Sequence, residues 1–142
     1  MKIAIVGPFP DGDHLLSQET VLSCVREALK PYGDIQFSGW QIIGRVDKRQ
    51  LRKDRATIYG SNQALAMARA VWVTDYVLSQ IASFDPATAI VSVGGARSIG
   101  AKVGDSERRL DRAVDIYALF DREIRLINSS KPPTETRTIV CP

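Results

Sequence analysis

Hydrophobic residues follow two different periodicities along this chain. Runs rich in β-branched residues at 2–6, 35–46 and 89–93 predict strands that end at glycine, proline or charged residues. Hydrophobic positions recur at helical spacing over about 15–30 and 62–82, which predicts two long helices. Such helices need a hydrophobic sheet face to cover. We therefore expect an α+β fold, a two-layer sandwich in which two helices pack on a small mixed β-sheet.

The pattern between residues 106 and 126 supports two interpretations. Alternation from Val114 to Ala118 fits a strand, whereas the same segment also fits one face of a helix, formed by Leu110, Val114, Tyr117, Phe120 and Ile124. Periodicity alone leaves both open. Residues 127–142 contain two consecutive prolines and few hydrophobic residues, so we expect a domain over 1–126 followed by a tail or extended arm.

Composition places the chain among ordinary globular domains. Its 142 residues are 44% hydrophobic and 25% charged, which suits one domain with one core. The net charge of +3 is too small to specify a nucleic-acid partner, and none is expected. No hydrophobic run approaches the roughly 20 residues of a membrane span, and residues 1–8 do not resemble a signal peptide. We therefore expect no transmembrane segment.

Residues suited to metal or covalent chemistry are few. Cys24 and Cys141 lack metal-binding spacing, and Cys24, within a helical pattern, is expected to be a buried small hydrophobic residue; a disulfide with Cys141 stays open if the chain is exported. His14, the one histidine, follows Asp13 in a turn and is expected to be exposed. No serine has a histidine partner in a plausible triad. The sequence thus predicts no catalytic residue, metal or cofactor.

Three motifs occur in a familiar order. Gly44-Arg45-Val46-Asp47 ends the second predicted strand, Asn62-Gln63-Ala64-Leu65-Ala66-Met67-Ala68-Arg69-Ala70 opens the second helix, and Arg112-Ala113-Val114-Asp115-Ile116 follows. Together they resemble the OmpA-like peptidoglycan-binding domain, whose motifs are Gly-x-Thr-Asp, Asn-x-x-Leu-Ser-x-x-Arg-Ala and Arg-Arg-Val-Glu-Ile. The resemblance implies a strand from about Arg112.

The resemblance also implies a ligand and the residues that bind it. The ligand is the diaminopimelate of the peptidoglycan stem peptide, in the periplasm or cell envelope, bound without catalysis. Asp47 would accept the ammonium group, and Arg69, expected near the start of its helix, would hold the carboxylate by two parallel hydrogen bonds. Asn62, as the helix N-cap, Leu65 and Arg112 complete the expected site. Simpler roles remain open: an Asp47–Arg69 salt bridge, a core Leu65 and a surface Arg112.

The chain differs from this family at several positions. Val46 and Ala66 replace a threonine and a serine, and Ala113 replaces an arginine. The loop between Asp47 and Asn62 is longer than usual, and basic residues gather in and beside it: Arg45, Lys48, Arg49, Arg52, Lys53 and Arg55. These residues suit an anionic partner or simply a solvated loop.

Two alternative functions follow from other features. Gly94–Gly100 follows a strand and has the spacing of a weak phosphate-binding loop, so the chain could be a cytosolic α/β module that binds a nucleotide or phosphate. Alternatively, it is an OmpA-like interaction domain that has lost the wall ligand.

Overall fold

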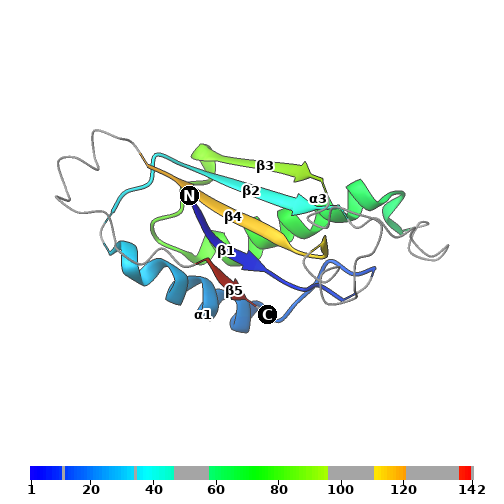
Figure 1. Cartoon of the computed structure of the whole chain (residues 1–142), viewed down its shortest axis with the longest axis horizontal. Helices are drawn as coiled ribbons and strands as arrows, with labels where there is room; N and C mark the ends of the chain where they lie inside the picture. The colour runs from blue at the N-terminus through cyan, green and yellow to red at the C-terminus, as the bar shows by residue number, and fades with distance from the viewer. Residues whose placement is uncertain (11, 34, 47–57, 96–110, 121–137, 142) are drawn as a thin grey trace.

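The computed structural model describes residues 1–10, 12–33, 35–46, 58–95, 111–120 and 138–141. They form a five-stranded sheet in the order β3-β2-β4-β1-β5 (Figure 1). The strands are β1 (Lys2–Val6), β2 (Gly39–Arg45), β3 (Ala89–Gly94), β4 (Val114–Leu119) and β5 (Ile139–Cys141). β4 is antiparallel to β1 and β2, while β2–β3 and β1–β5 are parallel pairs. The sheet is therefore mixed, as expected.

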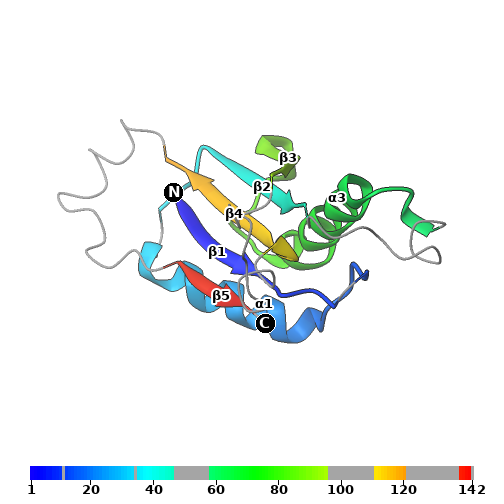
Figure 2. The same cartoon turned by 45° about the vertical axis from the view of Figure 1, so that its right-hand side comes forward.

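Two helical segments cross between the parallel strands. α1 (Gln18–Leu29) continues into a 3-10 turn at Lys30–Tyr32. α3 (Asn62–Trp72) continues through a π-helical turn, Val73–Val77, and a 3-10 turn, Leu78–Gln80. The steps from β1 to β2 and from β2 to β3 run in the same direction across the sheet. Right-handed crossovers then place both helices on one face, where α1 packs against β1 and α3 against β2 and β3 (Figure 2).

One hydrophobic core fills the space between the sheet and the helices. The strands contribute residues such as Val6, Ile42 and Ile116, and α1 contributes Val21 and Val25, all fully buried. Trp40, Phe37 and Phe84 form an edge-to-face aromatic group at the end of the core where β2 begins. The α+β two-layer fold predicted from the sequence is confirmed, and the ambiguous segment forms a strand over Val114–Leu119.

The C-terminal arm adds a strand that the pattern did not predict. Ile139–Cys141 pairs in parallel with β1, and Thr138 donates a side-chain hydrogen bond to the Lys2 carbonyl oxygen. Cys141 is fully buried and forms a disulfide with Cys24 of α1, with a Cα–Cα distance of 5.6 Å. The pairing that the sequence left open is therefore made, and it fastens β5 to α1.

We expect removal of this disulfide to destabilise the domain. It closes a loop across a sequence separation of 117 residues, so its loss frees much of the unfolded chain. Changing Cys24 and Cys141 together to serine should lower the free energy of unfolding by about 2–4 kcal/mol, measured by urea denaturation. Reduction of the wild type should produce a similar loss, since Cys24 and Cys141 account for both cysteines. An unchanged urea midpoint after complete reduction would contradict this expectation.

Candidate functional site

Four parallel strands end together at one end of the sheet, where the sequence placed the ligand site. In the last rows of the ladder, Val6 pairs with Val114 and Cys141, and Gly44 pairs with Val114 and Val93. The connections that leave β1, β2 and β3 all start here, beside the residues that enter β4. We call this the carboxyl end of the sheet.

α3 lies against the sheet at this end, where its backbone contacts β2. A Cβ atom added at Gly44 would lie 2.0 Å from the carbonyl oxygen of Ala66 and 2.7 Å from its carbonyl carbon. Gly44 of the first motif, on β2, and Ala66, which replaces the serine of the second motif on α3, are thus in direct backbone contact. This contact sets the distance from α3 to β2, and with it the position of the Arg69 side chain.

Arg69 lies under the connection between β1 and α1. Its side chain is 1% exposed. The Nε atom donates to the Asp13 carbonyl oxygen at 2.7 Å, and one terminal nitrogen donates to the Pro10 carbonyl oxygen at 3.2 Å. The guanidinium carbon also lies 5.4 Å from the centre of the Phe9 ring, a cation–π contact. Arg69 is therefore a buried cation held by backbone oxygens.

The expected position of Arg69 near the helix start is wrong. Arg69 lies in the last turn of α3, so the free N–H groups of the helix N-terminus are not beside its side chain. Trp72, one helical turn further on, makes an edge-to-face contact with Phe9 at 5.9 Å. The end of α3 thus holds Phe9 between Arg69 and Trp72.

Arg112 also binds the β1–α1 connection. Its Nε atom donates to the Phe9 carbonyl oxygen at 3.1 Å, and its own carbonyl oxygen accepts from the Phe9 N–H at 2.7 Å. Two motif arginines, one on α3 and one two residues before β4, therefore hold the same backbone segment. Arg112 has a defined contact here, and its expected role toward a ligand remains a prediction.

The predicted cap of α3 is one residue too late. Ser61 is the N-cap, because its hydroxyl oxygen accepts the N–H of Ala64 at 3.1 Å. Asn62 is the first residue of the helix and is partly buried. Serine and asparagine are both favoured N-cap residues, so the sequence alone allowed either Ser61 or Asn62 in this role. Leu65 is buried, consistent with the simpler role in the core.

Asp47, the predicted ammonium ligand, lies outside the described residues. β2 ends at Arg45, and the description stops at Val46, whose N–H donates to the Gly94 carbonyl oxygen at 3.2 Å. Most of the basic loop and residues 96–100 of the proposed phosphate loop also lie outside the described part. Their expected roles stay predictions.

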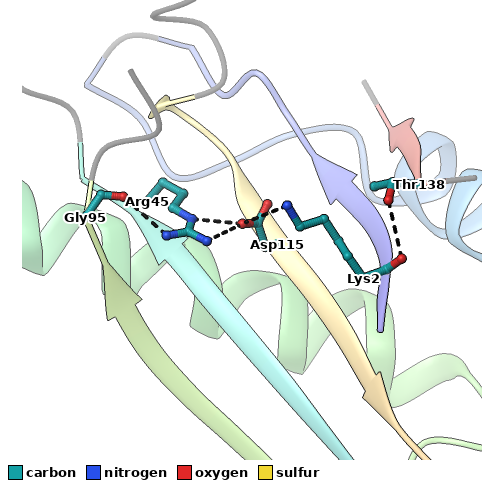
Figure 3. A network of polar contacts seen from close by, with 5 residues as sticks. All are labelled: Lys2, Arg45, Gly95, Asp115 and Thr138. Carbon is teal, nitrogen blue, oxygen red and sulfur yellow. Dashed lines mark hydrogen bonds and ion pairs between the residues drawn. The ribbon is translucent and has the colours of Figure 1, made fainter. Parts of the chain in front are cut away.

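On the sheet face that the helices do not cover, Lys2, Arg45 and Asp115 form an ionic cluster that the sequence did not predict. Figure 3 shows Arg45 on β2 and Lys2 on β1 reaching toward Asp115 on β4, whose side chain is 0% exposed. Arg45 donates from Nε and from a terminal nitrogen to Asp115 Oδ2 at 2.8 and 2.7 Å, while Lys2 Nζ lies 3.9 Å away. Only the order of the strands brings these residues together, and the hydrophobic pattern does not supply it.

Gly94 leaves room for the Arg45 side chain of this cluster. A Cβ atom there would lie 2.7 Å from a terminal nitrogen of Arg45 and 2.7 Å from Cγ2 of Ile43. The missing side chain lets Arg45 lie along the sheet toward Asp115. Packing thus explains the first glycine of the proposed phosphate loop without a ligand.

His14 and Tyr59 form a second contact that the sequence did not indicate. His14 Nδ1 and Tyr59 Oη share a hydrogen bond of 2.6 Å, and the two rings meet edge to face with centres 5.6 Å apart. The Asp13 carboxylate accepts the His14 backbone N–H at 2.7 Å. The histidine expected to be exposed is only partly so.

The described part of the chain lacks two features, a metal-binding cluster and a membrane-spanning helix. It contains no group of three or more histidine, cysteine, aspartate or glutamate residues arranged to hold a metal ion. None of its helices combines the length and hydrophobicity required to span a bilayer.

The geometry defines a small α+β domain in which arginines from two motifs order the connection at the carboxyl end of the sheet. No family model and no curated protein matches the sequence. Among solved structures, the fold is similar to the OmpA-like domain of FopA1 from Francisella tularensis subsp. tularensis SCHU S4. The two chains are 18% identical, and the match has a TM-score of 0.49 over 78% of this chain and 68% of that one.

Proposed function

We propose that this domain binds peptidoglycan without catalysis, through the diaminopimelate of the stem peptide. The observation that carries the proposal is the position of the motif arginine. Arg69 lies with a fixed guanidinium at the carboxyl end of the sheet, and β2 ends there two residues before Asp47. The order of all three sequence motifs supports the same ligand.

The chemistry of this ligand suits the proposed pair. The distal centre of diaminopimelate is a zwitterion, so Asp47 would accept from its ammonium group while Arg69 donates to its carboxylate. Each charge-assisted hydrogen bond contributes about 1.5–3 kcal/mol net. A few such bonds correspond to micromolar affinity, which suits a reversible wall contact and requires no cofactor.

The disulfide supports a location in the cell envelope. Disulfides persist in oxidising compartments such as the periplasm and are rare in the cytosol. The Cys24–Cys141 bond joins two elements of the folded domain and is part of its structure. This favours an exported protein over the cytosolic nucleotide-binding alternative. The packing role of Gly94 weakens that alternative further.

Binding to isolated cell walls tests the proposal. The wild-type domain should sediment with purified sacculi that contain diaminopimelate, and Asp47→Asn should raise the dissociation constant at least tenfold because it removes the charged ammonium acceptor. Tenfold corresponds to about 1.4 kcal/mol, less than one charge-assisted bond contributes. Asp75→Asn, on the exposed side of the helical segment after α3, makes the same charge change and should bind as the wild type does.

The outcomes separate the candidate functions. Equal retention of both variants would mean general attraction of a basic domain to an anionic polymer. No retention of the wild type would reject wall binding and leave an interaction domain without this ligand.

A further inference from the structure

The guanidinium of Arg69 is covered by the chain itself. Its Nε and one terminal nitrogen donate to carbonyl oxygens of Asp13 and Pro10, and the side chain is 1% exposed. A bidentate carboxylate offers two oxygens to a pair of neighbouring N–H groups in the same way. The backbone oxygens thus take up donors that a carboxylate ligand would use. A ligand can use these donors only after this segment moves.

The covering segment is ordered by contacts at both of its ends. We call Phe9, Pro10, Asp13 and His14 the lid. At the first end, Arg112 donates to the Phe9 carbonyl oxygen. Within the lid, the Asp13 N–H donates to the Pro10 carbonyl oxygen at 3.0 Å, so this oxygen accepts from both Asp13 and Arg69.

At its second end, the lid is hydrogen-bonded to the segment before α3. His14 shares its 2.6 Å hydrogen bond with Tyr59, which belongs to the segment that precedes the Ser61 cap of α3. The lid and the start of α3 are more than forty residues apart in sequence, since the two bonded residues are separated by 45. The bond therefore ties the connection after β1 to the connection before α3.

We propose that the lid is an autoinhibitory element and that the His14–Tyr59 bond is its latch. In the closed state, carbonyl oxygens of the lid occupy Arg69. In the open state, the two donors that the lid occupies, Nε and one terminal nitrogen, become available to a carboxylate. The identity of that carboxylate rests on the proposed function, whereas the opening of the lid does not.

The latch sets how often Arg69 is accessible. A ligand that binds only the open state has an apparent affinity reduced by the fraction of molecules that are open. Breaking one ordinary hydrogen bond should raise that fraction about threefold to tenfold. Ligand affinity and the chemical reactivity of Arg69 should rise by the same factor, because both need the open state.

Tyr59→Phe tests the latch directly, since it removes only the hydroxyl group. We would treat the folded, oxidised domain with phenylglyoxal and measure modification of each arginine by peptide mass spectrometry. Arg69 should react about threefold to tenfold faster in Tyr59→Phe than in the wild type. Arg26, exposed on α1, serves as the internal standard. Tyr76→Phe is the matched control, because Tyr76 is 54% exposed and stacks on Trp72.

Titration with a diaminopimelate muropeptide completes the test. Tighter binding by Tyr59→Phe, by the factor seen for Arg69 modification, would support the lid as a regulator of the ligand site. Faster Arg69 modification without any muropeptide binding would support the lid and reject the proposed ligand. An unchanged rate of Arg69 modification would overturn the lid, whatever the ligand result.

Discussion

Replacing Gly44 with alanine is expected to prevent stable folding. The new methyl group would lie 2.0 Å from the Ala66 carbonyl oxygen, well inside van der Waals contact. This neighbour is helix backbone, so the clash cannot be relieved by a side-chain rotation. α3 would have to move away from β2 and lose its packing on the core. Overpacking usually costs about 1–3 kcal/mol, and we expect a loss above that range.

Urea denaturation followed by circular dichroism measures this effect. Gly95→Ala is the matched control, because a Cβ atom at Gly95 would meet nothing within 4 Å in the part of the chain that the structure describes, and its φ is not positive. This control should stay within about 0.5 kcal/mol of the wild type. A Gly44→Ala domain as stable as the control would mean that α3 does not lie on β2 at this distance.

Replacing Arg45 with methionine is expected to have the second-largest effect. The change leaves the fully buried Asp115 carboxylate with Lys2, whose Nζ lies 3.9 Å from Oδ2, as its remaining partner of the cluster in Figure 3. Removal of one partner from a buried ion pair costs about 3–5 kcal/mol, because the remaining charge keeps its desolvation penalty. We expect a loss in that range.

Lys2→Met provides the comparison for Arg45→Met. Lys2 is partly exposed and makes the longer contact with Asp115, so its replacement should cost no more than about 1 kcal/mol. Both variants lose one positive charge, which cancels the effect of net charge on stability. Equal losses in the two variants, measured by urea denaturation, would contradict the assignment of Arg45 as the main partner of Asp115.

The elements with strong periodicity could be predicted from the sequence. The strand over Lys2–Val6 and the helical segment from Asn62 agree with the structure. Each is a local pattern of buried side chains, so neighbouring residues contain the information. The strand at Val114–Leu119 could not be distinguished from a helix, because its inner and outer faces are both largely buried and its alternation is weak.

Features that depend on contacts between residues far apart in the sequence could not be predicted. β5 has three residues, and the contacts that hold it are its pairing with the edge of β1 and the disulfide from Cys141 to Cys24. The Arg45–Asp115 pair needs β2 beside β4, and the order of strands is not a local property. The sequence predicted Arg69 as a ligand-binding residue, a role that stays a prediction, and in the structure backbone carbonyl groups cover its guanidinium. Side-chain patterns do not report the positions of those carbonyls.

The most direct test of peptidoglycan binding is an NMR titration of the oxidised domain with a diaminopimelate-containing muropeptide. Wild type, Asp47→Ala and Arg69→Lys should be compared, since lysine keeps the charge of Arg69 but not its paired donors. We predict saturable shifts of the Asp47, Asp13 and Arg69 amide signals in the wild type, lost or strongly weakened in both variants. Absence of shifts in the folded wild type at millimolar muropeptide would contradict peptidoglycan binding by this domain.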